Sequence, residues 1–195
     1  MNIMTPKDRA ASGTPWPDGL TPAPLDATRG STEPWAAGVV AALAVAIGAH
    51  TIAELGLGCG RTSRWLVAAL QRMGGGVFHG FDRDASAITE TEKTLASVPH
   101  DDVAIRCHVG TLPGTLRELG NATIDLVWLD DTHSVAHVAT ELEALRRIVR
   151  VGGIVCGHDV VGHGNVGQAF LDVGGYLVDC PGFAPSHGIG LWQIR

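Results

Sequence analysis

The sequence contains few cysteines, and no two of them stand close together. The four cysteines are Cys59, Cys107, Cys156 and Cys180, and no Cys-x-x-Cys motif occurs. Zinc ribbons and thioredoxin-like redox sites depend on such a motif, so the spacing argues against both. Isolated cysteines are typical of buried thiols in a reducing compartment, and we therefore expect a cytoplasmic protein.

Basic residues and long apolar stretches are also scarce. Fourteen Lys and Arg residues against twenty Asp and Glu give a formal charge of -6, so we expect no nucleic-acid partner. The N-terminal residues lack the apolar core of a secretory signal. The longest stretch without Asp, Glu, Lys or Arg is 34–53. Its apolar part, 35–49, is shorter than the ~20 residues of a spanning helix, which favours a buried helix and no membrane contact.

The chain nevertheless has enough apolar residues to fold as one domain. It has 195 residues, of which 45% are hydrophobic, and this excludes a disordered chain. Five of the ten prolines lie within residues 1–30, so we expect a proline-rich arm there and a single domain over 31–195. We expect the first helix to begin near Ser31 or Thr32, with either as its cap and Glu33 in its first turn.

From residue 51 onward, short apolar runs alternate with helical patterns. Such alternation predicts crossover connections and a mostly parallel sheet covered on both faces. The last two strands are joined by a segment too short for a crossover helix, so they are expected to be antiparallel. The expected strands are 51–57, 77–81, 103–108, 124–129, 153–157, 176–180 and 189–194, and the expected helices are 62–73, 85–96, 112–119, 134–149 and 166–173.

A glycine-rich loop follows the first expected strand. Glu54, Gly56, Gly58 and Gly60 stand at alternate positions, and an expected helix begins directly after them. Glycine lets the chain turn sharply and lets a ligand approach the backbone, which indicates nucleotide or nucleoside binding. The third glycine comes one residue too early for the G-x-G-x-x-G dinucleotide motif. Asp82, after the second strand, is placed to accept hydrogen bonds from ribose hydroxyls; in the alternative readings, the glycines serve only a tight turn and Asp82 is a solvated acid.

A second set of motifs lies in the C-terminal half. Asp130 and His133 follow the fourth strand as D-x-x-H-S, and Gly152-Gly153 leads to His158-Asp159 after the fifth. Together with the E-x-G-x-G-x-G loop, this pattern resembles class I S-adenosylmethionine-dependent methyltransferases, in particular the catechol-type O-methyltransferases and the cephalosporin-hydroxylase-like group. The resemblance covers residues 35–195.

The resemblance implies a Rossmann-like α/β fold and an S-adenosylmethionine site. The fold would have a seven-stranded sheet in the order 3-2-1-4-5-7-6 with strand seven antiparallel. The family's acid after strand three is missing here, so adenine would be held by backbone groups or Thr111. The residues implied to bind the cofactor are Glu54, Gly56, Gly58, Gly60, Thr62, Ser63, Asp82, Arg83, Gly110, Thr111 and Asp130.

Asp130, His158 and Asp159 are candidate ligands for a divalent cation at the carboxyl ends of neighbouring strands. In catechol-type relatives this ion is Mg²⁺, and it acidifies the hydroxyl that is methylated. Imidazole is a softer ligand than Mg²⁺ prefers, so Mn²⁺, Zn²⁺ and a site without metal all stay open. Asp130 can instead cap a helix or contact the cofactor's amino group.

His133 is the candidate general base, because the family's lysine is replaced here by Thr132 and His133. An imidazole suits proton removal near neutral pH. The alternatives are that His133 caps the following helix or packs against Trp128.

These features predict methyl transfer from S-adenosylmethionine to an oxygen atom of a small molecule, with catalysis by His133 and Asp130. Two other classes remain: a nicotinamide-dependent oxidoreductase and a non-catalytic Rossmann-like binding module. The early third glycine and the terminal strand pair argue against the oxidoreductase. The oligomeric state is open, with a homodimer as one option.

Overall fold

A single seven-stranded sheet organises the chain in the computed structural model, which describes residues 32–162, 166–179 and 187–195. Its order is β3-β2-β1-β4-β5-β7-β6, as predicted, and β7 runs antiparallel to both of its neighbours. The expected arm at 1–30 lies outside the described residues. The strands are β1 Thr51–Leu55, β2 Gly76–Asp82, β3 Val103–Val109, β4 Ile124–Leu129, β5 Val149–His158, β6 Tyr176–Val178 and β7 Ile189–Gln193. The helices are α2 Pro34–Ala46, α3 Arg61–Arg72, α4 Ala85–Leu95, the 3-10 helix η1 Gly114–Glu118, α5 Val135–Ile148 and α6 Val166–Asp172.

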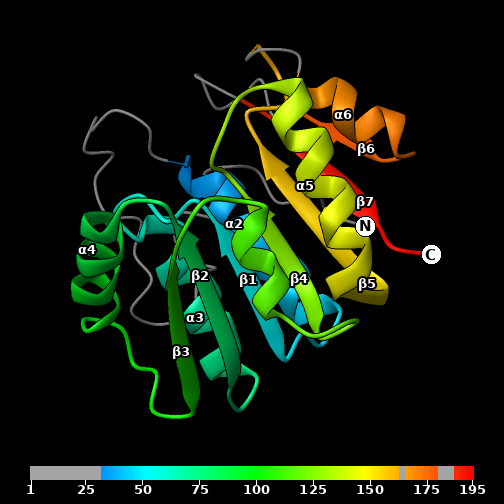
Figure 1. The fold of residues 1–195 in the computed structure, drawn as a ribbon. Coiled ribbons are helices and arrows are strands. Elements are labelled where there is room, and N and C mark those ends of the chain that lie inside the picture. Colours follow the sequence, from blue (N-terminus) through cyan, green and yellow to red (C-terminus); the bar gives the residue numbers. More distant parts are fainter. Residues whose placement is uncertain (1–31, 163–165, 180–186) are drawn as a thin grey trace, which may run out of the picture.

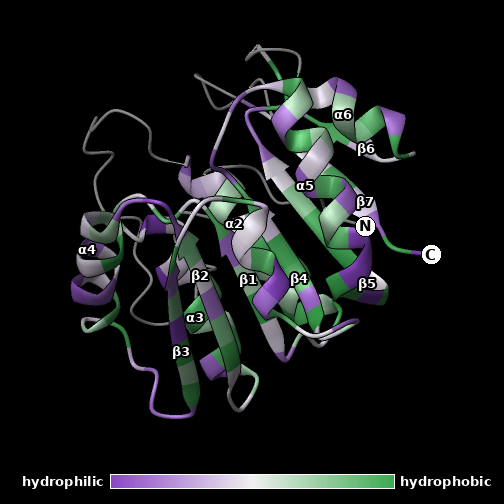
Figure 2. Cartoon of the chain, in the orientation of Figure 1, coloured by the Kyte–Doolittle hydropathy of each residue, from purple (hydrophilic) through white to green (hydrophobic). Residues whose placement is uncertain are grey.

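Helices cover both faces of the sheet (Figure 1). Leu142 of α5 and Phe170 of α6 belong to one hydrophobic core, and Leu66 of α3 and Val40 of α2 to the core on the other face. Strand β4 is mostly hydrophobic, whereas α4 and α5 also carry hydrophilic residues (Figure 2). The lack of alternation in the central strands therefore follows from burial on both sides.

Helix α2 is buried on one side only, since Val39 is 37% and Val45 43% exposed. Its inner side includes Ala37, which packs against Trp65 of α3. The expectation of a buried helix is therefore right for one face of α2.

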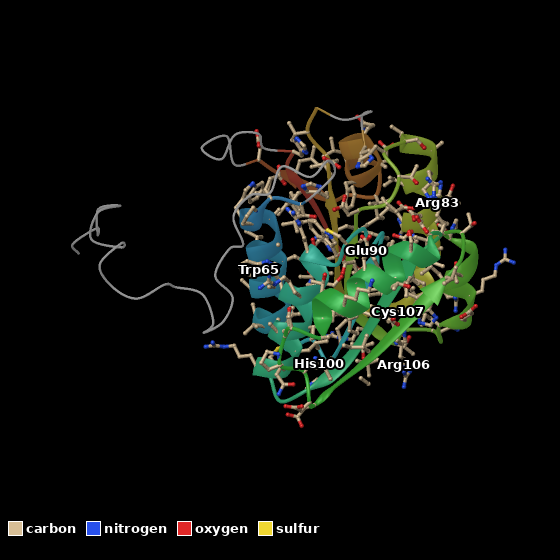
Figure 3. All side chains as sticks on the ribbon, turned by 90° about the vertical axis from the view of Figure 1, so that its left-hand side faces the viewer. Trp65, Arg83, Glu90, His100, Arg106 and Cys107 are labelled. Carbon is tan, nitrogen blue, oxygen red and sulfur yellow. The ribbon has the colours of Figure 1, made fainter. Side chains whose placement is uncertain are left out.

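In the view from the β3 edge, the labelled Arg83 and His100 lie toward opposite ends of the sheet (Figure 3).

The start of α2 corrects a sequence expectation. Glu33 occupies the N-cap position with no side-chain capping bond, and Pro34 is the first helical residue. Thr32 does not cap the helix; its hydroxyl donates to Asp130 Oδ2 at 2.8 Å. The side chains of Thr32 and Glu33 contact Asp130 and His158, which are far away in sequence. Local capping rules do not consider such partners. Ser31, the other expected cap, lies outside the described residues.

Two further elements differ from the expectation. The predicted helix 112–119 is only the short 3-10 helix η1, in a segment that contains Pro113 and Gly114, both poor helix formers. Strand β5 begins at Val149, four residues early, because the chain leaves α5 directly into the sheet. The register shift opposite β4 and the positive φ of 82° at Gly152 accommodate the irregular start.

The loops after β1, β2 and β4 are joined by backbone hydrogen bonds at one edge of the sheet. Gly56 donates to the carbonyl of Phe81 at 2.9 Å, and Asp130 donates to that of Leu55 at 2.8 Å. Strand β1 lies between β2 and β4, so the chain turns outward in both directions from it. Ligands of open α/β sheets bind at such a switch point, outside the carboxyl ends of the strands.

Candidate active site

A groove of about 370 Å³ lies at this edge of the sheet. The loops after β1, β2, β3 and β4 form it, together with residues at the start of α4 and α5. Seven of the predicted cofactor residues line it, which agrees with a ligand site at the switch point. The lining residues are Gly56, Gly58, Asp82, Arg83, Asp84, Ala87, Gly110, Thr111, Leu112, Asp130, Asp131, Thr132 and His137.

The first two glycines of the loop serve different purposes. Gly56 has φ +90°, and a Cβ atom there would stand 2.3 Å from the carbonyl oxygen of Asp130. Glycine at this position therefore permits the contact between the β1 and β4 loops. Gly58 has φ +54°, and a Cβ atom there would meet nothing within 4 Å. Open space above Gly58 leaves the backbone accessible to a ligand.

Asp82 is bound to the glycine loop itself. Its Oδ2 accepts hydrogen bonds from the backbone N–H of Leu57 at 3.0 Å and of Gly58 at 3.3 Å. Its Oδ1 accepts one from the N–H of Asp84 at 2.9 Å. An ionised carboxylate has about four acceptor positions, so room remains for a ribose hydroxyl. Asp82 thus fixes the glycine loop, a role that the sequence did not predict, and its role at the ribose stays a prediction.

Glu54 lies beneath the loop, beside a smaller hollow of about 50 Å³ that Thr62 and Asp130 also line. The residue is only 2% exposed, and no described group forms a hydrogen bond with its Oε2. Burial raises the pKa of this carboxyl well above its ordinary value, and the charges of Asp130 and Asp82 act in the same direction. A cationic ligand group in the hollow would relieve this strain.

Besides Glu54, three predicted cofactor residues do not line the large groove. Thr62 donates from its hydroxyl to Thr32 Oγ1 at 2.9 Å, which extends the chain of hydrogen bonds to Asp130. Ser63 is fully buried. A Cβ atom at Gly60 would stand 2.9 Å from the Cα of Thr91, so this glycine permits packing against α4. The sequence pattern did not separate these supporting residues from those at the surface.

His158 is the centre of a buried charge cluster at the end of β5. Its Nε2 lies 2.5 Å from Glu33 Oε2, and its Nδ1 lies 3.3 Å from Asp130 Oδ1 and 3.4 Å from Asp159 Oδ2. Burial alone would lower the pKa of this imidazole, but the three surrounding carboxylates raise it to about 12. A carboxylate lies at each ring nitrogen of His158, which favours the protonated imidazole.

Asp159 connects this cluster to two further histidines. Its Oδ2 contacts His133 Nε2, and its Oδ1 lies 2.8 Å from His187 Nδ1. The side chain of His133 is 46% exposed, so it contacts both the acid and solvent. Asp159 has a positive φ of 56°, which is unusual outside glycine and typical of functional positions. The helix after β4 is capped by Ser134, so capping is not the role of His133.

Sequence reasoning missed Thr32, Glu33 and His187. The first two stood out only as helix-start residues, and His187 lies in a turn-rich segment without a pattern. Thr32 contacts Asp130, 98 residues away, and Glu33 contacts His187, 154 residues away. No local signal could identify such pairs.

The comparisons with known proteins agree with this geometry. A family model for the methyltransferase domain matches residues 53–160, which is more than half of the chain. The chain belongs to this methyltransferase family. No curated protein matches the sequence of this chain. The matched range begins within β1 and ends after Asp159, so it includes the glycine loop and both motifs of the C-terminal half.

Solved structures share the fold of the methyltransferase at low sequence identity. The O-methyltransferase from Bacillus cereus, in complex with SAH, has a TM-score of 0.74 at 14% identity over 86% of this chain and 84% of that one. TomG from Streptomyces achromogenes, in complex with SAM, has a TM-score of 0.69 at 20% identity over 85% and 82%. Cofactor-bound Rv0187 from MTB has a TM-score of 0.75 at 17% identity, over 86% of this chain and 83% of that one. The resemblance to class I methyltransferases is thus confirmed in family and fold.

Proposed function

We propose that this methyltransferase transfers the methyl group of S-adenosylmethionine to an oxygen atom of a small molecule. Family membership and the shared fold support methyl transfer. The solved neighbours that carry SAM or SAH, and those described as O-methyltransferases, support the donor and the oxygen acceptor. No described helix is long and apolar enough to cross a membrane.

The acidity of the groove carries the choice of cofactor. Among its lining residues are four aspartates, and Arg83 is the one Lys or Arg among them. The pyrophosphate of a nicotinamide dinucleotide would be repelled there, whereas the positive sulfonium and ammonium groups of S-adenosylmethionine would be attracted. The buried Oε2 of Glu54 has no hydrogen-bond partner among the described residues, so the N–H groups of an ammonium would satisfy it. The oxidoreductase alternative is therefore disfavoured.

The predicted cofactor residues divide among the parts of S-adenosylmethionine. Glu54 and Asp130 would hold the amino-acid end, and Asp82 with Arg83 would hold the ribose. Gly110 and Thr111, after β3, would contact the adenine. When bound, the cofactor supplies an activated methyl group, and the protein's contribution is to position the acceptor and to remove one proton.

His133 is proposed as the residue that removes this proton. It is partly exposed, and its Nε2 contacts a carboxylate oxygen of Asp159. A carboxylate beside an imidazole fixes its orientation and stabilises the charge that it acquires on accepting a proton. Asp159 is therefore a positioning residue for His133, and Asp130 connects this group to the glycine loop.

The predicted metal site fits a cation less well. The ligand atoms of Asp130, His158 and Asp159 do lie within 4.8 Å of one another. A metal ligand must offer a lone pair, however, and both nitrogens of His158 face carboxylates. The proposed proton removal by His133 therefore needs no ion at this site.

The test is a product assay with the full chain. The protein is incubated with S-adenosylmethionine and a panel of phenols, catechols, hydroxy acids and carboxylic acids, and S-adenosylhomocysteine and methylated products are measured by mass spectrometry. We expect acceptor-dependent product formation that falls at least tenfold in Glu54→Gln. Cofactor binding without turnover on any acceptor would favour the non-catalytic binding module. Turnover confined to amine or thiol acceptors would contradict O-methylation.

A further inference from the structure

A second cluster of ionisable side chains lies on the wall of the groove. Asp131 follows β4, and His137 and Glu141 are one turn apart on α5, so they share a face of that helix. His137 Nε2 lies 3.1 Å from Asp131 Oδ2 and 3.4 Å from Glu141 Oε1. None of these residues belongs to the cluster around His158.

Glu141 is an unusual residue for its position. It is fully buried and adjoins Val138 and Leu142 of the core, and neither carboxylate oxygen has a hydrogen-bond partner among the described residues. His137 Nε2 faces Oε1 at 3.4 Å without forming a hydrogen bond, so burial of this carboxyl is costly, and a bound cation would compensate for it.

The spacing of the three groups suits a metal ion. One ligand atom from each residue lies within 4.8 Å of the others. Ligands placed ~2.1 Å from a tetrahedral ion are about 3.4 Å apart, close to the distances of 3.1 and 3.4 Å from His137 Nε2 to the two carboxylates. One imidazole and two carboxylates favour Zn²⁺, Mn²⁺ or Co²⁺ over Mg²⁺, which prefers oxygen ligands and water.

We propose that Asp131, His137 and Glu141 bind a divalent transition-metal ion on the wall of the groove. Asp131 and His137 also line the groove, so the ion has an open side toward it. Three protein ligands with an open position are typical of sites that accept water or a ligand atom as the fourth. The inference does not depend on methyl transfer, because the ion would bind whether or not a cofactor does.

The test is a metal titration of the full, metal-stripped chain. Co²⁺ is followed by its visible absorption and Zn²⁺ by calorimetry, on the wild type and on His137→Gln, Glu141→Gln, His158→Gln and the exposed-site control His50→Gln. Circular dichroism confirms that each variant folds. Glu141→Gln keeps the shape of the side chain, so it provides a readout even if another variant unfolds.

We expect one site in the wild type, with affinity reduced at least ~10-fold in His137→Gln and Glu141→Gln. The His158→Gln and His50→Gln variants should bind within about threefold of the wild type. Absence of binding in the wild type, or unchanged affinity in His137→Gln, would overturn the proposal. Loss of binding in His158→Gln alone would assign the ion to the other cluster and overturn it as well.

Discussion

Glu33 and His158, which are 125 residues apart in sequence, form a buried ion pair with 2.5 Å between Oε2 and Nε2. Burial works against the charge of Glu33, but the hydrogen bond from His158 keeps its pKa below the ordinary value. Glu33 also accepts a hydrogen bond from the backbone N–H of His187 at 3.0 Å. The start of α2 is therefore tied to the site through β5 and to the segment before β7.

Substitutions of Glu33 and His158 should have non-additive effects on the free energy of unfolding. Glu33→Gln leaves a buried charge incompletely paired, so we expect a loss of about 3–5 kcal/mol in the free energy of unfolding. Urea denaturation of Glu33→Gln, His158→Gln and the double variant measures the coupling. The double variant should lose less than the sum of the two single losses. Strictly additive losses would show that the two side chains do not interact.

The lowered pKa of His79 predicts that the free energy of unfolding falls in mild acid. Burial, followed by the charges of His108 and Arg106, lowers its pKa from 6.5 to about 4. Between these two values the unfolded chain binds a proton that the folded chain does not, so stability falls as the pH falls through this range. The loss should reach about 3 kcal/mol near pH 4.

The measurement is urea denaturation across this pH range for the wild type and for His79→Leu. Acid effects from other groups act on both proteins, so the wild type should show the steeper fall. The exposed His50→Gln variant should retain the wild-type slope. Parallel curves for wild type and His79→Leu would contradict the pKa shift.

His133→Gln should lower kcat by about 10²–10⁴-fold with little change in cofactor affinity, because proton removal is lost while the groove remains. The rise of the wild-type pH–rate profile that comes from deprotonation of the base should be absent from the variant. His187→Gln is the matched control, since His187 also contacts Asp159. A similar loss in both variants would mean that Asp159, and not His133, is the essential group.

Chelation tests the cluster around His158. Because both ring nitrogens of His158 face carboxylates, EDTA should leave kcat within about threefold in the wild type. Glu141→Gln should behave in the same way, which separates this test from the proposed site on α5. Loss of turnover in both proteins, restored by Mg²⁺, would place an ion at Asp130.

The fold could be predicted because its signals are local. The alternation of apolar runs and helical patterns produced the central strands, and the resemblance supplied their order. The 3-10 helix η1 and the early start of β5 were missed. Both depend on how Pro113 and the Gly152 region are accommodated against neighbouring elements, which periodicity does not report.

The site was predictable where a motif marked it and not where distant segments meet. Gly56, Gly58, Asp82 and Asp130 line the groove, and their contact with a cofactor stays a prediction. Thr32 and Glu33 looked like helix-start residues, because their partners Asp130 and His158 are far away in sequence. The charge state of His158 likewise follows from three carboxylates that only the tertiary structure brings together.

Calorimetric titration of the full chain with S-adenosylmethionine and with NAD tests the central claim most directly. We expect micromolar binding of S-adenosylmethionine and no measurable binding of NAD, because the groove is acidic. Asp82→Ala should weaken S-adenosylmethionine binding by roughly 1.5–3 kcal/mol, since it removes the acceptor for both the loop and the ribose. Tighter binding of NAD than of S-adenosylmethionine, or unchanged affinity in Asp82→Ala, would contradict the account.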